Sequence, residues 1–343
     1  MMNRAAQAGW ALLFLTSMLI GGARADPVAD FYAKRLVTIV AGTATGGTYD
    51  LYARTVARHI GKYIPGSPKV VVQNTPGAGG YLGAMRVLEV GPHDGTIIGA
   101  LGSSALPFQP LLDPNSPKFD SLNINWLGSV TGYNVLMLVR SDVPVHSVDD
   151  LRKRETVMAT IAAGQFNSVV VAAANAALGT RIKGVRGHKG MNPAMLALES
   201  GEVEGYPTAP VDALKRLYSK QIADGTFRLL LQFGPAPSKD FPDVPYALDL
   251  AKTAADRSLL DVAQGPLGVG YAYMLGPGVP PDRAAALRAA FEATLRDPDF
   301  LAEANKQVLT VAPISAQDIQ TRLAKAYETS PAILAPIRAV FGK

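Results

Sequence analysis

The chain has 343 residues, no cysteine, and 33 lysine and arginine residues against 28 aspartate and glutamate residues, which gives a formal net charge of +5. The lack of cysteine excludes disulfides, thiolate zinc sites and a cysteine nucleophile. The short basic stretches lack interleaved aromatic residues, so nucleic acid is not an expected partner.

The N-terminal segment has the pattern of a secretory signal peptide. Arg4 precedes an apolar run over 10–20, and Ala23-Arg24-Ala25 provides a small-x-small cleavage pattern. The apolar run is too short to span a bilayer comfortably, and no later stretch approaches the roughly 20 apolar residues of a membrane helix. We expect a signal peptide over 1–25, a soluble mature chain from about Asp26 and a periplasmic location. An uncleaved membrane anchor is the alternative.

Two glycine-rich turns follow, each between an apolar stretch and a predicted helix. The first turn contains Gly46 and Gly47, and the second is Gly77-Ala78-Gly79-Gly80. The second turn leads into a predicted helix over 81–90. Apolar residues after the first turn recur with helical spacing until Gly61 ends the pattern (Tyr49, Tyr52, Ala53, Val56, Ala57 and Ile60).

The two glycine turns predict an anion site, and neither contains a basic residue. A helix N-terminus leaves its first backbone N–H groups unpaired and carries about half a positive charge. Two such turns that face one cleft can therefore hold a carboxylate without a basic side chain. Asp50 lies in the first turn of its helix, where it either complements the helix dipole or contacts a ligand directly.

The middle of the chain alternates predicted strands and helices. The turn Pro92-His93-Asp94-Gly95 leads to a strand over 96–101, which ends at Gly102-Ser103-Ser104. A helix with Asn192 as its N-cap and Pro193 at its first position is expected to cover 194–200. Another helix should cover 210–222, and the patterns indicate further strands over 134–140, 157–162, 203–206 and 227–233.

The C-terminal region is expected to be almost wholly helical. Helices should begin at Pro280-Pro281-Asp282, after Asp297, and at a capping pair formed by Ser315 and Asp318. The alternation of strands and helices predicts an α/β fold with largely parallel sheets. A mature chain of this length normally forms two domains.

Known catalytic and cofactor motifs are missing from the sequence. The four histidines (His59, His93, His146 and His188) show no metal-ligand spacing, and no catalytic Ser or Cys motif occurs. The first turn lacks the P-loop lysine, and Leu82 replaces the last glycine of a dinucleotide fingerprint. We therefore expect no metal and no cofactor. An exported hydrolase or lyase is the enzyme alternative, with Asp50, His188 and Lys189 as its candidate acids and bases.

Several motifs in order resemble one family. They are Gly46-Gly47-Thr48-Tyr49-Asp50 after a strand, Asn74-Thr75-Pro76-Gly77-Ala78-Gly79-Gly80 after the next strand, and Pro92-His93-Asp94-Gly95-Thr96. Later segments at 196–204, 241–245 and 275–281 extend the likeness over nearly the whole mature chain. The sequence resembles the Bug family, the periplasmic receptors of tripartite tricarboxylate transporters.

The resemblance implies a two-lobed, Venus-flytrap α/β fold in which each lobe is a mostly parallel sheet flanked by helices. Crossings near Tyr133 and Gly234 would give lobe 1 as 26–132 plus 235–343 and lobe 2 as 133–234. The implied function is that of a monomeric, non-enzymatic receptor. It would capture a di-, tri- or aromatic carboxylate in the interlobe cleft and deliver it to integral membrane transporter subunits. A periplasmic sensing or scaffold protein with the same fold is a further alternative.

The resemblance also implies which residues line the cleft. In such receptors, loop backbone, short polar side chains and ordered water hold the carboxylate. The second-lobe loop departs from the usual small-residue pattern, and its residues transfer less directly. Tyr49, Phe166 and Tyr206 either stack on a ligand ring or pack in the core. The matching positions are Thr45, Gly46, Gly47, Thr48, Asp50, Ala78, Gly79, Ser103 and Ser104 in lobe 1, and Gln165, Phe166, Asn167, Ser168, Tyr206 and Thr208 in lobe 2.

Overall fold

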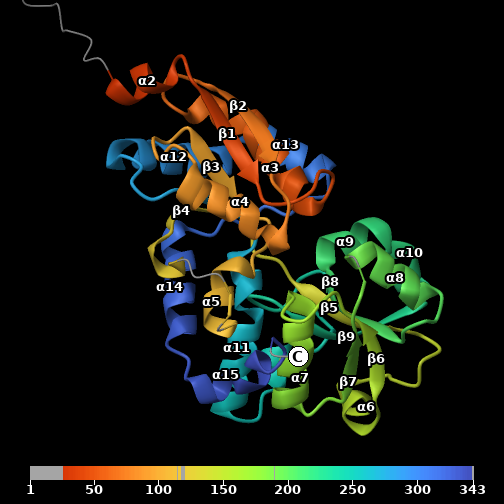
Figure 1. Ribbon diagram of the computed structural model, residues 1–343. Coiled ribbons are helices and arrows are strands. Elements are labelled where there is room, and N and C mark those ends of the chain that lie inside the picture. The colour runs from red at the N-terminus through yellow and green to blue at the C-terminus, as the bar shows by residue number, and fades with distance from the viewer. Residues whose placement is uncertain (1–25, 114, 117–119, 189, 342–343) are drawn as a thin grey trace, which may run out of the picture.

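The computed structural model describes residues 26–341, except residues 114, 117–119 and 189. The predicted signal peptide and Lys189 therefore lie outside the described residues. Figure 1 shows an upper and a lower α/β body joined by segments of the chain. Within the described ranges, no helix is long and apolar enough to cross a membrane.

The upper body is built on a five-stranded sheet with the order β2-β1-β3-β10-β4 (Figure 1). β1 pairs in parallel with β2 and β3, whereas β10 pairs antiparallel with β3 and β4. Its strands are β1 (Leu36–Ala41), β2 (Lys69–Asn74), β3 (Ile97–Ala100), β4 (Asn125–Ser129) and β10 (Ala272–Leu275). α3 packs against α12 and α13, and the helices of this body are α2 (Pro27–Tyr32), α3 (Thr48–Ile60), α4 (Tyr81–Met85), α12 (Pro281–Thr294) and α13 (Pro298–Lys306).

The lower body contains a second five-stranded sheet with the order β7-β6-β8-β5-β9. β6 pairs in parallel with β7 and β8, whereas β5 pairs antiparallel with β8 and β9. Its strands are β5 (Val135–Arg140), β6 (Thr156–Ala159), β7 (Ile182–Val185), β8 (Gly205–Pro210) and β9 (Phe227–Phe233). Its helices are α6 (Val148–Lys153), α7 (Phe166–Leu178), α8 (Met191–Glu199), α9 (Val211–Leu217) and α10 (Ser219–Ala223).

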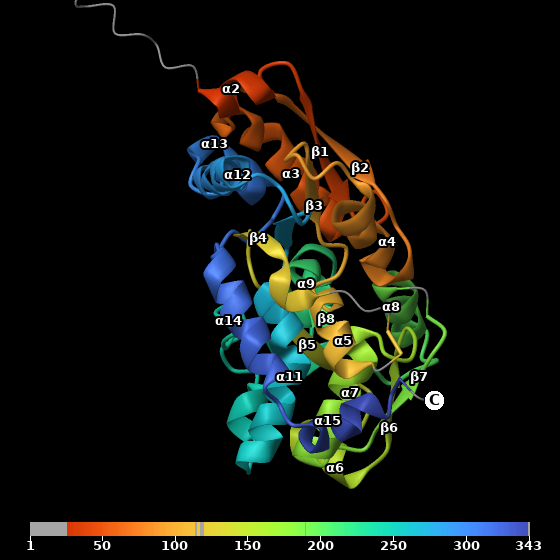
Figure 2. The same cartoon turned by 60° about the vertical axis from the view of Figure 1, so that its left-hand side comes forward.

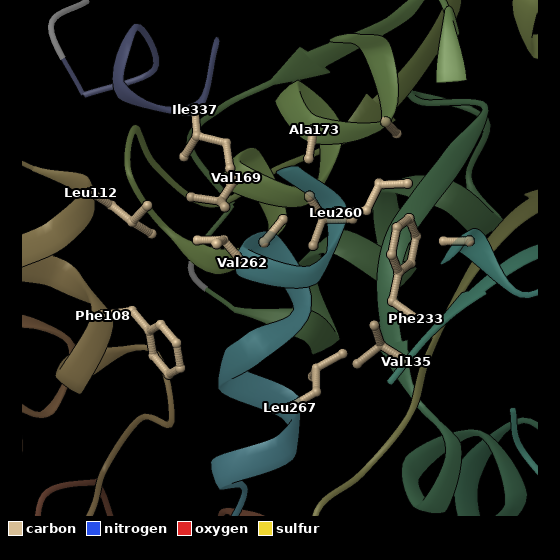
Figure 3. Packing of buried hydrophobic residues seen from close by; sticks show 14 of the residues in the cluster. Phe108, Leu112, Val135, Val169, Ala173, Phe233, Leu260, Val262, Leu267 and Ile337 are labelled. Carbon is tan, nitrogen blue, oxygen red and sulfur yellow. The ribbon is translucent and has the colours of Figure 1, made fainter. Parts of the chain in front are cut away.

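A layer of helices lies beside α7 and is formed by chain that precedes β4 or follows β9 (Figure 2). It consists of α5 (Gln109–Leu112), α11 (Ala254–Val269), α14 (Ala316–Tyr327) and α15 (Pro331–Arg338). α11 packs on α7, while α14 packs on both α11 and β4. Figure 3 shows the resulting core, in which Leu260 and Val262 of α11 meet Val169 of α7 and Ile337 of α15. This apolar layer therefore contacts both sheets.

The chain path places the strands of each sheet in distinct stretches of sequence. The first sheet takes its strands from residues before 130 and from β10, and the second takes all of its strands from residues 135–233. The predicted crossings near Tyr133 and Gly234 fall at the two ends of the stretch 135–233. The lobe boundaries themselves stay a prediction.

Local sequence signals gave several elements correctly. α3 covers the predicted apolar stripe and ends at Gly61, and β9 covers the predicted strand over 227–233. Asp297 caps α13, and the Ser315 side chain accepts a hydrogen bond from the Asp318 backbone N–H at the start of α14. These features depend on short-range patterns, so sequence alone predicts them.

Other expectations are wrong in detail. α8 begins at Met191 after Gly190, so Asn192 and Pro193 lie inside its first turn. A proline is tolerated there because the N–H groups of the first turn make no hydrogen bond within the helix. The helix predicted over 210–222 is interrupted at Tyr218, whose non-helical backbone places its ring 5.9 Å from that of Phe227. The helix predicted over 81–90 continues beyond Met85 as a π-helical turn.

The sheets are mixed, because each combines parallel and antiparallel pairs in place of the mostly parallel arrangement expected. The sequence analysis did not predict β10, because the C-terminal region was expected to be almost wholly helical. β10 follows α11, which lies in the lower layer, and the chain therefore enters the first sheet from the end that faces the second body. That direction of entry makes β10 antiparallel to β3.

Candidate functional site

Contacts between glycines bring the loops after β1, β2 and β3 together. A Cβ atom built on Gly102 would lie 1.9 Å from the carbonyl oxygen of Gly42. A Cβ atom built on Gly80 would lie 3.0 Å from the Cα of Gly102. Only residues without side chains fit this junction. It places the two predicted glycine turns and the Ser103-Ser104 segment at one edge of the first sheet.

The second glycine turn has a backbone that favours glycine. Gly77, Gly79 and Gly80 have φ values of 137°, 65° and 97°, in the region that residues with side chains rarely adopt. Ala78 and Gly79 are exposed, and a short 3₁₀ turn leads from them into α4. The N–H groups of a first helical turn have no partner within the helix. Ala78 and Gly79 therefore expose backbone in this turn, and the anion site expected there stays a prediction.

The first glycine turn is held from below by Asp50, which is 2 % exposed. Its Oδ2 accepts hydrogen bonds from the Gly46 N–H (2.8 Å) and from Arg54 Nε (3.0 Å), and its Oδ1 accepts one from Asn74 Nδ2 (2.8 Å). Burial alone would raise the pKa of Asp50, but the hydrogen bonds from Arg54, Gly46 and Asn74 outweigh it and lower that pKa. The carboxylate is thus engaged by the protein itself, while Thr45, Gly46 and Gly47 are exposed and Thr48 is half-buried.

A group of hydroxyls links the third loop to Tyr49 and Tyr133. The Ser104 N–H donates to the Tyr49 hydroxyl at 3.0 Å, and Ser104 Oγ lies 3.1 Å from the Tyr133 hydroxyl. The Tyr49 ring packs 4.7 Å from that of Tyr271. Tyr49 and Ser104 therefore serve the loop scaffold, whereas Ser103 is half-buried.

The second body contributes a loop at the start of α7. The Asn167 Oδ1 accepts a hydrogen bond from the Ser168 N–H at 2.9 Å, and Ser168 Oγ donates to the Ala162 carbonyl at 2.8 Å. Both residues are buried and hold the loop in shape. Phe166 packs against the core that α11 and α7 share. Of the predicted residues here, the half-buried Gln165 lies close to the other body, because its Nε2 is 3.6 Å from a Cβ position built on Gly79.

Two further predicted residues lie on β8. Tyr206 and Thr208 are 3 % and 6 % exposed, and Tyr206 belongs to the core beneath α8 and α9. Burial raises the pKa of Tyr206, and hydrogen bonds with Thr208 and Asn167 oppose this shift. Tyr49, Phe166 and Tyr206 each have packing partners within the protein, which favours the packing alternative over stacking on a ligand ring.

Contacts centred on Thr310 were missed by the sequence analysis. Thr310 Oγ1 donates to Asp212 Oδ1 at 2.9 Å, and the Tyr52 hydroxyl donates to the Thr310 carbonyl at 2.9 Å. Tyr133 and Asp212 also line a cavity of about 410 Å³ beside the crossings. The contacts join distant parts of the sequence, and no local signal marks them. Arg54 was missed as well, although its position four residues after Asp50 is the spacing of a helical ion pair.

Among the candidate acids and bases of the enzyme alternative, the two described residues, His188 and Asp50, are engaged separately. His188 Nδ1 lies 3.1 Å from the Thr160 carbonyl oxygen in the second body, whereas Asp50 is enclosed beneath the first loop. Within the described part of the chain, no cluster of three or more His, Asp or Glu side chains could hold a metal ion.

The molecule has two α/β bodies, and a loop of each lies close to the other at Gly79 and Gln165. This is the architecture of the two-lobed solute-binding proteins. The sequence matches the family described as "Tripartite tricarboxylate transporter family receptor" over residues 52–337, and the chain belongs to that family. It is a solute-binding receptor, and the family assignment replaces the enzyme alternative.

Solved structures confirm the fold class. The periplasmic binding protein BugD is 20 % identical, with a TM-score of 0.64 over 90 % of this chain and 98 % of that one. Rpa4515 of R. palustris with adipate is 20 % identical, with a TM-score of 0.61 over 90 % of this chain and 98 % of that one. MatC from Rhodopseudomonas palustris with bound malate is 20 % identical, with a TM-score of 0.58 over 90 % of this chain and 99 % of that one.

Proposed function

We propose that the chain captures a small carboxylate between its two bodies and delivers it to the membrane subunits of a tripartite tricarboxylate-type transporter. The observation that carries this proposal is the junction of two exposed glycine turns opposite Gln165, with backbone N–H donors and no basic side chain in either turn. The adipate of Rpa4515 and the malate of MatC support the ligand class. A cleaved signal peptide over 1–25 would place the monomeric receptor in the periplasm.

The proposed lobes are 26–132 with 235–343, and 133–234. In this proposal the exposed residues of the first two loops, with Ser103 and Gln165, contact the carboxylate directly or through water. The buried predicted residues Asp50, Ser104, Asn167 and Ser168 give the loops their shape, while Tyr206 and Thr208 are buried on β8. Such a division is typical of a site whose specificity depends on fixed backbone groups.

Ligand binding is tested most directly by thermal unfolding with a panel of adipate, malate, citrate and benzoate. At least one carboxylate should raise the melting temperature, because ligand at 100 times its Kd adds about 2.7 kcal/mol to the stability of the folded state. Putrescine and glucose should leave the melting temperature unchanged. Stabilisation by the sugar or the amine alone would contradict the anion site.

A second prediction concerns closure of the two bodies. A ligand that contacts both the Gly79 turn and Gln165 should favour a closed state, and the cavity beside the crossings leaves room for the segments to bend. Small-angle X-ray scattering should therefore give a smaller radius of gyration with the best carboxylate of the panel than without it. An unchanged scattering profile at saturating ligand would argue against closure.

A further inference from the structure

Asn74, the last residue of β2, connects four residues in and after the first loop. Its Nδ2 donates to Asp50 Oδ1 at 2.8 Å and to the Thr43 carbonyl at 3.0 Å. Its Oδ1 accepts hydrogen bonds from Arg54 Nη2 at 2.8 Å and from Thr45 Oγ1 at 3.4 Å. The amide therefore uses both of its polar atoms on the loop and on the helix that follows it.

Arg54 completes this cluster from the next turn of α3. Its guanidinium bridges two acceptors, with Nε on Asp50 and Nη2 on Asn74. It is also the charged group that pairs with the buried Asp50 carboxylate. The other contacts of Asp50 come from the Gly46 backbone and the Asn74 amide, which are neutral.

From this geometry we infer that Arg54 and Asn74 are positioning residues for carboxylate binding. They fix the loop over 43–48 so that its exposed backbone can meet the ligand, and Arg54 offsets the negative charge of Asp50 beneath an anion site. The inference rests on the proposed function. Without this ion pair, a carboxylate ligand would approach an uncompensated buried carboxylate, which would repel it.

The chemistry of the cluster leaves little choice of residue. Each group that contacts Asp50 is a hydrogen-bond donor, and an ionised carboxylate is an acceptor only. An asparagine at position 50 would set its own amide donor against one of these donors. A lysine at position 54 would keep the charge but could not bridge two acceptors in the plane of a guanidinium.

The test compares Arg54→Gln with Arg86→Gln. Arg86 is a matched control, because its Nη2 also bonds to a side-chain amide at the end of β2, that of Gln73 at 3.0 Å, but it holds no part of the first loop. Calorimetry with the panel carboxylate that stabilises the wild type most should show at least tenfold weaker binding for Arg54→Gln at pH 8. Arg86→Gln should bind within twofold of the wild type.

The pH profile distinguishes positioning from a general loss of structure. In Arg54→Gln, the Asp50 carboxylate loses its ion pair, and its burial should raise its pKa. Protonation at pH 5 then removes the repulsive charge, so the variant should recover part of its affinity relative to pH 8. The wild type should show no such recovery, because its Asp50 stays ionised with a lowered pKa.

Hydrogen exchange of the ligand-free proteins provides a readout that needs no ligand. The backbone amides over 43–48 should exchange at least tenfold faster in Arg54→Gln and in Asn74→Leu than in the wild type. In Arg86→Gln their exchange rates should equal those of the wild type. Arg54→Lys serves if Arg54→Gln does not fold, and it should loosen the loop without the recovery at pH 5. Wild-type affinity and exchange in the Arg54 and Asn74 variants would overturn the inference. If no carboxylate binds the wild type, the proposed function fails, while the exchange rates still decide whether this cluster positions the loop.

Discussion

Replacing Gly102 by alanine is expected to lower the free energy of unfolding by about 3 kcal/mol, because the new methyl group would overlap the backbone of Gly42. The built Cβ lies 1.9 Å from the Gly42 oxygen and 2.4 Å from its carbonyl carbon. Neither atom belongs to a flexible side chain, so two loops must separate to relieve the overlap. Urea unfolding followed by circular dichroism measures the change.

Gly47→Ala is the matched control for this stability measurement. Gly47 has an extended backbone at the N-cap of α3, and a Cβ atom there would have its nearest neighbour at 3.8 Å. Alanine is a poorer N-cap than glycine and should cost less than about 1 kcal/mol. Equal stabilities of the two variants would mean that the loops tolerate separation at Gly102 and that their junction is not close-packed.

The elements that sequence predicted well depend on local signals. α3 follows from apolar spacing between a glycine turn and Gly61, and α13 follows from Asp297 and the proline after it. β10 could not be recognised in the same way, because four buried residues between helical segments resemble part of a buried helix. Its place between β3 and β4 is decided by pairing with strands that are remote in sequence.

The candidate site likewise has one part that local sequence signals predict and another that depends on long-range contacts. The glycine turns were predictable because helix N-termini with glycine have a recognisable pattern. The scaffold was not, since Tyr133 reaches Tyr49 across 84 residues and Thr310 reaches Asp212 across 98. Asp50 is an example, because the sequence alone did not decide whether it complements the helix dipole or contacts a ligand. The structure shows a carboxylate whose two oxygens both accept hydrogen bonds from its own loop and neighbours.

The second large effect is expected at the ligand-facing turn. Gly79→Val should weaken carboxylate binding by tenfold or more, about 1.4 kcal/mol. Gly79 is exposed with φ 65° and ψ 24°, which strains a β-branched residue, and a side chain there would project toward Gln165 Nε2. The valine would both distort the turn and fill the space that a ligand held by backbone N–H groups requires. Calorimetry with the best carboxylate of the panel measures the loss.

Gly179→Val separates backbone strain from loss of the site. Gly179 ends α7 with φ 70° and ψ 22°, almost the conformation of Gly79, and a Cβ atom built there meets nothing within 4 Å. Both valine variants should therefore lose similar amounts of stability, because both force a β-branched residue into the left-handed region. Only Gly79→Val should lose affinity, since Gly179 lies at the far end of α7 from Gln165. Wild-type affinity in folded Gly79→Val would show that the second glycine turn does not hold the carboxylate, and recognition would then have to come from side chains elsewhere between the two bodies.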